Sequence, residues 1–140
     1  MKKAIRFSIY IIMAAVLVSL SGCQKDRVTL LTDGVWKFEN ITTKSEDEAV
    51  KTLVAGFKAA YTDGTMQFFS DGTYIKEFPL IDDETGTWEL VGETQLVFTP
   101  DGGVVQTASI DRIRKKELVY LETFLDQNQN PFNTRTTWVK

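Results

Sequence analysis

The sequence predicts an all-β fold: an eight-stranded antiparallel up-and-down barrel with one α-helix between strands 1 and 2, after an N-terminal signal segment. Glycine and proline recur at short intervals after residue 30, and the runs between them are rich in Thr, Val, Ile and aromatic residues. That pattern is typical of many short strands joined by tight turns. Closing such a sheet into a barrel removes the edge strands that otherwise invite pairing with other chains.

The strands are expected where β-branched and aromatic residues lie between turn signals. We predict Val35–Thr42, Thr65–Ser70, Thr73–Phe78, Gly86–Val91, Thr94–Thr99, Val104–Asp111, Glu117–Leu125 and Asn133–Val139. Asp71-Gly72 and Gly92-Glu93 predict tight hairpins, since glycine adopts a positive φ at little cost. Because the connections are short, sequential strands should be neighbours in the sheet.

The stretch Asp47–Tyr61 breaks the strand pattern. Its apolar residues have the i, i+3, i+4, i+7 spacing of a helix with one buried stripe, at Val50, Leu53, Val54, Phe57 and Tyr61. Ser45 and Glu48 predict a capping box at its start, and Asp47 with Lys51 predicts an i, i+4 ion pair. The sequence therefore predicts one amphipathic helix packed on the barrel.

Gly56 lies inside this predicted helix, beside several alanines. Glycine costs about 1 kcal/mol relative to alanine at such a position, so we expect a close approach of the helix to the sheet there. Two roles remain open for the helix. It is either a lid that gates the barrel mouth through Leu53, Val54 and Phe57, or a fixed plug with a permanently buried stripe.

The N-terminus has the layout of a secretory signal peptide. Basic residues at Lys2 and Lys3 precede an apolar run of 14 residues, Phe7–Leu20, which is shorter than the roughly 20 residues of a membrane span. The run ends in Leu20-Ser21-Gly22-Cys23, which resembles the lipobox of bacterial lipoproteins. In that family the cysteine is acylated, by palmitate-type chains, and becomes the first residue of the mature protein.

This resemblance divides the chain into three parts: residues 1–22 as a lipoprotein signal peptide, 23–29 as a tether and 30–140 as the barrel domain. The tether starts with Gln24-Lys25-Asp26, which partly resembles the surface-export signal of Bacteroidota lipoproteins. We expect Cys23 to hold the domain close to the bilayer, because two or more acyl chains give stable anchoring.

The composition excludes several classes of protein. Three of the sixteen basic residues and none of the nineteen acidic residues precede Cys23, so the remaining chain has a net charge of −6. A nucleic-acid-binding protein would show a basic surface instead. The chain has no histidine and a single cysteine, which removes the usual catalytic bases, nucleophiles and zinc ligands. We therefore expect no enzyme, no metal site and no cofactor.

Several short motifs resemble the lipocalin-like domains of Bacteroidota lipoproteins. Gly34-Val35-Trp36 is similar to the Gly-x-Trp mark of lipocalins, and the runs FFSDGTYIKEF, GTWEL, LVFT and IDRIRKKELVYLE are similar to later parts of that domain. The resemblance covers about Leu30 to Lys140. It implies a lipocalin-like (calycin-type) barrel in which the tryptophan closes one end beside a basic residue of the last strand, here Arg135. It also implies a small apolar ligand and no catalytic residues.

Alternation along the strands places large apolar side chains inside the barrel. The candidate ligand-binding residues are Trp36, Phe38, Phe68, Trp88, Leu90, Phe98 and Tyr120. Eight strands enclose a space that side chains can fill or that holds one small ligand. Both interpretations stay open: a pocket for an apolar or aromatic molecule, or a filled core.

Two charged segments have a functional and a plain interpretation. Asp82-Asp83-Glu84 offers oxygen ligands that suit Ca²⁺, although a solvated loop explains it as well. The segment Arg112–Lys116 holds four basic residues. It could contact anionic lipid headgroups, or it is a solvated turn whose internal partner is a residue such as Glu117.

The sequence thus favours a lipoprotein of the cell envelope, anchored through Cys23 to the outer membrane, on its periplasmic side or at the cell surface. As a hypothesis, its barrel binds a small apolar or amphipathic ligand. The alternative is a structural or interaction module with a filled barrel, whose partner is another envelope protein.

Overall fold

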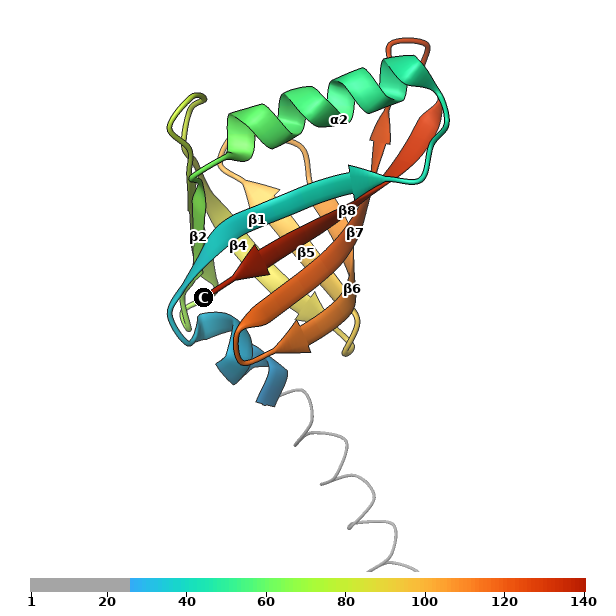
Figure 1. Cartoon of the computed structure of the whole chain (residues 1–140). Helices are drawn as coiled ribbons and strands as arrows, with labels where there is room; N and C mark the ends of the chain where they lie inside the picture. Colours follow the sequence, from blue (N-terminus) through green and yellow to red (C-terminus); the bar gives the residue numbers. More distant parts are fainter. Residues whose placement is uncertain (1–25) are drawn as a thin grey trace, which may run out of the picture.

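Residues 26–140 are described by the computed structural model, and they form a closed antiparallel barrel (Figure 1). The strands follow one another around the barrel in chain order, and β8 pairs with β1 to close it. This confirms the predicted fold. The elements are β1 Val35–Thr43, α2 Glu48–Tyr61, β2 Thr65–Phe68, β3 Thr73–Glu77, β4 Glu84–Val91, β5 Gln95–Pro100, β6 Gln106–Arg114, β7 Glu117–Leu125 and β8 Pro131–Val139.

The sixth strand differs most from its predicted bounds. It starts at Gln106 and not at Val104, and it continues to Arg114, which pairs with Glu117 of β7. Val104 and Val105 are β-branched but lie outside the sheet in an exposed loop. A register shift between Ile110 and Arg112 marks a bulge in the strand, and the hairpin to β7 is correspondingly tight.

Inward-facing side chains fill most of the barrel. The buried cluster consists of Leu31, Trp36, Met66, Phe68, Tyr74, Leu90, Leu96, Phe98, Ala108, Leu118, Tyr120 and Trp138. Aromatic rings meet near its centre, where the Phe98 ring lies 5.9 Å from Phe68 and 5.1 Å from Tyr74, between ring centroids. Burying one such large side chain contributes about 1.5–3 kcal/mol, so this cluster is the main source of the barrel's stability.

One end of the barrel is closed by a helical segment at residues 26–32, drawn in blue in Figure 1. Leu31 is fully buried. The Trp36 indole Nε1 donates to the Leu31 carbonyl at 2.9 Å, and the Lys140 Nζ donates to the Leu30 carbonyl at 3.0 Å. The Lys140 ammonium also lies 4.2 Å from the Trp36 ring centroid.

The basic residue beside Trp36 is therefore Lys140, and the expectation of Arg135 is wrong. Arg135 alternates with the inward-facing Thr134 and Thr136, so its side chain points outward. There its Nη2 pairs with Asp111 Oδ2 at 2.9 Å.

Residues 26–29 of the predicted tether belong to this helical segment. Arg27 Nη1 donates to the Glu93 carbonyl in the turn between β4 and β5, which ties the segment to the barrel. The signal peptide, Cys23 and the rest of the tether lie outside the described residues. Within residues 26–140, no helix is both long and apolar enough to span a bilayer.

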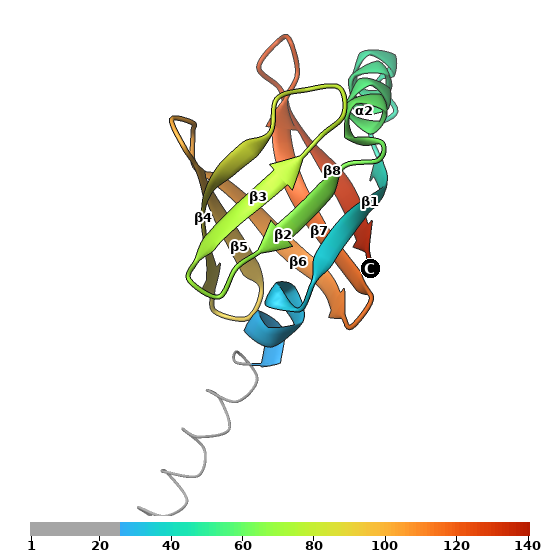
Figure 2. The same cartoon turned by 90° about the vertical axis from the view of Figure 1, so that its left-hand side faces the viewer.

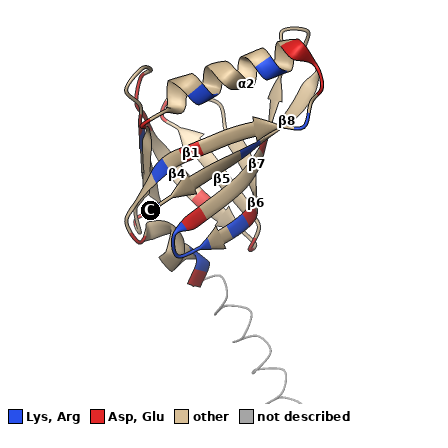
Figure 3. Cartoon of the chain, in the orientation of Figure 1, with Lys and Arg blue, Asp and Glu red and all other residues tan. Residues whose placement is uncertain are grey.

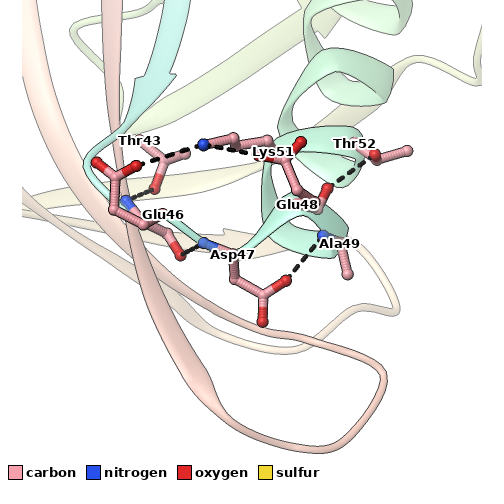
Figure 4. A network of polar contacts seen from close by, with 8 residues as sticks. Thr43, Glu46, Asp47, Glu48, Ala49, Lys51 and Thr52 are labelled. Carbon is pink, nitrogen blue, oxygen red and sulfur yellow. Dashed lines mark hydrogen bonds and ion pairs between the residues drawn. The ribbon is translucent and has the colours of Figure 1, made fainter.

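The start of α2 is held by a polar network that differs from the predicted capping box (Figure 4). The N-cap is Asp47, whose Oδ1 accepts from the Ala49 N–H at 2.8 Å. Ser45 lies two residues earlier and accepts from Asp47 N–H instead. The predicted Asp47–Lys51 pair is also wrong, because Asp47 is used as the cap and Lys51 pairs with Glu48 at 2.9 Å.

The buried stripe of α2 packs on the end of β1 and the start of β8. Val50 and Val54 are buried against Ile41 and Phe132. Gly56 faces away from the sheet, since a Cβ at this position would meet no atom within 4 Å. The predicted close approach at Gly56 is therefore wrong.

We predict that Leu31→Ala lowers the free energy of unfolding by about 3 kcal/mol, as expected for truncating a fully buried leucine. The matched control is Leu80→Ala, because Leu80 is 73% exposed and its truncation should change stability by less than about 0.5 kcal/mol. Urea titrations of both variants measure the difference. Equal, small losses would show that the helical segment does not contribute to the core.

Candidate functional site

A cavity of about 140 Å³ lies inside the barrel mouth, at the α2 end. Figure 2 shows the loop between β3 and β4 reaching toward the C-terminal end of α2 at this mouth. The rings of Tyr61 and Phe78 stack there with centroids 4.9 Å apart. The cavity is lined by Tyr61, Lys76, Phe78, Ile81, Asp82, Glu84, Gln106, Tyr120, Glu122, Phe124 and Trp138.

A buried ion pair forms one wall. Lys76 is only 6% exposed, and its Nζ lies 2.8 Å from Glu84 Oε1. The same carboxylate oxygen accepts from the Tyr74 hydroxyl at 2.8 Å. Burial alone would raise the pKa of Glu84, but the charge of Lys76 and hydrogen bonds from Lys76, Tyr74 and Gln106 together lower it below its ordinary value. Glu84 is therefore ionised at neutral pH, and the pair is neutral overall.

Lys76 also contacts aromatic rings. Its Nζ lies 4.4 Å from the Phe98 ring centroid and 5.4 Å from that of Tyr74. Such cation–π contacts stabilise a desolvated ammonium by about 2 kcal/mol. The Lys76 ammonium is thus stabilised by its ion pair with Glu84 and by the faces of two aromatic rings.

Glu122 also lines the cavity, and Lys76 acts on it only through the charge at a distance, without an ion pair. Among the described residues, no hydrogen bond or ion pair joins its carboxylate to another side chain. Burial raises the pKa of Glu122 to about 6, the charge of Lys76 opposes this rise, and the charge of Glu84 adds a smaller increase. Glu122 is thus a largely desolvated carboxyl group that changes charge just below neutral pH.

Two phenols complete the polar surface. Burial raises the pKa of Tyr61 to about 12 and that of Tyr120 well above its ordinary value. Both hydroxyls therefore keep their protons at neutral pH. The Trp138 Nε1 donates to the Tyr120 hydroxyl at 3.0 Å, which leaves the Tyr120 proton available to another acceptor.

The inner face of β8 continues this polar region. The hydroxyls of Thr134 and Thr136 are buried, and no hydrogen-bond partner for them lies within residues 26–140. These residues pair across the sheet with Glu122 and Tyr120, respectively. A buried hydroxyl without a partner costs about 1–3 kcal/mol, so the barrel retains hydrogen-bonding capacity beside the cavity.

The predicted interior residues lie in the core more than in the cavity. All seven are inside the buried cluster or packed against it: Trp36, Phe38, Phe68, Trp88, Leu90, Phe98 and Tyr120. Among these seven, Tyr120 also borders the cavity. Trp36 lies at the opposite end, beneath the segment 26–32.

Sequence reasoning missed the charged cavity residues. Lys76 lies between the inward-facing Tyr74 and the cavity residue Phe78, and Glu122 lies between Tyr120 and Phe124, in steps of two. The sequence does contain a pattern that indicates such residues: a charged residue with aromatic residues at positions i−2 and i+2. It marks a charged side chain that shares the inner face of the strand.

The two charged segments resolve into separate contacts. Asp82 and Glu84 both line the cavity, whereas Asp83 Oδ1 accepts from the Phe78 N–H at 3.1 Å outside it, so the three carboxylates do not form one cluster. Across residues 26–140, no group of His, Cys, Asp or Glu side chains is arranged to hold a metal ion.

The basic segment Arg112–Lys116 ends β6 and forms the β6–β7 turn. Arg112 pairs with Glu117 at 3.2 Å, the internal partner expected for a solvated turn. Figure 3 shows this turn at the end of the barrel that carries the segment 26–32. The Lys140 N–H donates to the Lys116 carbonyl at 3.3 Å, which places the turn beside residue 140.

We predict that Glu122 makes the fold less stable above pH 6. Its pKa is raised from 4.5 to about 6 on folding, so the folded state binds the proton more tightly than the unfolded chain. The cost of about 2 kcal/mol is present above pH 6 and disappears as pH falls toward 4.5.

Urea titrations of the wild type and Glu122→Gln at both ends of this range measure the effect. The wild type should gain about 2 kcal/mol relative to the variant on acidification. Glu89→Gln, on the exposed outer face of β4, is the matched control. A pH-independent difference for Glu122→Gln would contradict the raised pKa.

Among the comparisons with known proteins, a family model supports this architecture. A search of curated proteins finds no match. Among solved structures, the barrel is similar to a DUF4847 family protein from Bacteroides vulgatus, at 10% identity and a TM-score of 0.47, covering 76% of this chain and 93% of that one. The family model of the lipocalin-like domain matches residues 32–120. Over most of its barrel, therefore, the chain fits this model, and it belongs to the lipocalin-like domain family.

Proposed function

We propose that this protein is a lipid-anchored envelope lipoprotein whose barrel binds one small amphipathic molecule in the mouth cavity. The observation that carries the proposal is the cavity itself, since five aromatic rings and several polar groups line one space at the barrel mouth. Binding sites for small molecules commonly combine apolar walls with a few convergent polar groups. Membership of the lipocalin-like family supports a binding role over a catalytic one.

The size of the cavity limits the ligand. About 140 Å³ is close to the volume of roughly 150 Å³ that accommodates benzene in an engineered protein cavity. The ligand is therefore a molecule of about one ring, and a long acyl chain does not fit without movement of α2 or of the β3–β4 loop. The fixed-plug interpretation of α2 suits this picture, because Val50 and Val54 are buried against the barrel.

Anchoring rests on the sequence Leu20-Ser21-Gly22-Cys23 and the apolar run before it. The arrangement of the barrel supports it, because the described chain enters at the end opposite the cavity (Figure 1). An acylated Cys23 would hold that closed end toward the bilayer. The mouth would then face away from the membrane, open to molecules of the periplasm or the exterior.

The second candidate is an interaction module with no ligand. It is favoured by the small size of the cavity, since typical ligand pockets measure about 300–1,000 Å³. Leu80 and Ile81 are 73% and 45% exposed in the β3–β4 loop, and they would serve as an apolar contact for another envelope protein.

Occupancy of the cavity can be tested by tryptophan fluorescence. Trp138 lines the cavity, whereas Trp88 packs against the core away from it. We expect benzyl alcohol, a one-ring probe, to change the emission of the wild type and of Trp88→Phe. Trp138→Phe should lose this response. If native mass spectrometry of protein from its host finds no ligand and no variant responds to the probe, the interaction module is the better description.

The anchor can be tested by Cys23→Ala. Without the thiol no acyl chain can be attached, so we expect the variant to be released in soluble form or to stay unprocessed. Fractionation and intact-mass measurement distinguish these outcomes from the wild type. A processed variant that remains on the membrane would contradict lipid attachment at Cys23.

A further inference from the structure

The charges around the cavity are unbalanced. Lys76, Glu84, Glu122 and Asp82 all line it, so three carboxyl groups face one ammonium. Lys76 and Glu84 neutralise each other at 2.8 Å. Glu122 and Asp82 remain, and of these Glu122 is the more deeply placed, between its cross-strand partners Ala108 and Thr134. Neither of these neighbours carries a charge that could compensate it.

Aromatic rings surround this negative charge. The side chains of Tyr61, Phe78, Tyr120, Phe124 and Trp138 line the same cavity. The faces of such rings attract cations, and an aromatic cage is a recurring site for ammonium groups. The barrel already contains one example, since the Lys76 Nζ lies 4.4 Å from the Phe98 ring centroid.

An anionic ligand is disfavoured by the same arrangement. A carboxylate would face Glu122 and Asp82, and the one ammonium of the cavity is already bound by Glu84. Breaking a buried ion pair leaves an uncompensated charge, which is strongly unfavourable. Fatty-acid-like molecules are therefore poor candidates on charge as well as on size.

We propose that the mouth cavity binds a small organic ammonium cation, whose charged group pairs with Glu122 and whose apolar body lies against the surrounding rings. This inference rests on the proposed binding function and adds the chemical class of the ligand. The cation supplies the charged partner that Glu122 lacks. The aromatic rings cover the apolar body of the ligand, which is thereby removed from water.

The probes are benzylamine, benzyl alcohol and benzoate, which share one ring and differ in charge. Isothermal titration calorimetry of the full-length protein in lipid nanodiscs near neutral pH gives their affinities. We expect benzylamine to bind at least about tenfold more tightly than benzyl alcohol, as a charge-assisted hydrogen bond is worth roughly 1.5–3 kcal/mol. Benzoate should bind most weakly.

Glu122→Gln should reduce the preference for benzylamine over benzyl alcohol to about one. The matched control is Glu89→Gln, on the outer face of β4, which should keep the preference. Equal affinity of the wild type for amine and alcohol would overturn the inference and leave the proposed function standing. Absence of binding by all three probes would overturn both.

A second measurement uses the wild type alone and does not depend on the variant folding. The groups facing Glu122 are Lys76 of β3, Glu84 of β4, Tyr61 of α2, Tyr120 of β7 and Asp82 of the β3–β4 loop. Burial raises the pKa of Glu122 to about 6, so its charge is lost on acidification through that pH. The preference for benzylamine should then fall, while a constant preference between pH 7.5 and 5 would contradict the role of Glu122.

Discussion

Pairing of β1 with β8 is the constraint on which the rest of the structure depends. It closes the sheet from Lys37↔Val139 to Thr43↔Thr134, and eight strands then enclose a space that side chains nearly fill. The aromatic cluster fills the middle of the barrel interior, and the segment 26–32 closes one end of it. What remains is a cavity of about 140 Å³ at the other end, where α2 and the β3–β4 loop meet. Closure therefore determines both the size and the position of this cavity.

The interior combines a neutral ion pair with one additional carboxyl group. Replacement of a buried pair such as Lys76–Glu84 by apolar residues is often neutral or stabilising. A contribution to folding stability therefore does not account for the presence of this pair. Glu122 is a cost to the fold when ionised, because burial raises its pKa to about 6. Buried groups with such shifts are frequent at functional sites. A bound cation would offset this cost, so the free energy of unfolding of the barrel should increase when the proposed ligand is bound.

Most of the fold could be predicted because strand and turn signals are local. Asp71-Gly72 and the runs on either side of it form the β2–β3 hairpin as expected. Contacts between distant segments could not be predicted. Lys140 reaches Trp36 only because the last strand lies beside the first. The choice of Asp47 over Ser45 as the cap of α2 is a local detail that the residue types alone left open. The cavity was missed for a related reason: whether Glu122 meets Lys76 or water depends on barrel closure, which no single strand encodes.

The central claim is that Glu122 lies in the barrel as a desolvated carboxyl group without a cationic partner. A carbon-13 NMR titration of the side-chain carboxyl groups measures this directly. The account predicts that Glu122 titrates near pH 6, that Glu84 titrates below its ordinary range, and that saturating benzylamine shifts the Glu122 midpoint downward. Titration of Glu122 at its ordinary value of 4.5, with no response to the amine, would contradict it.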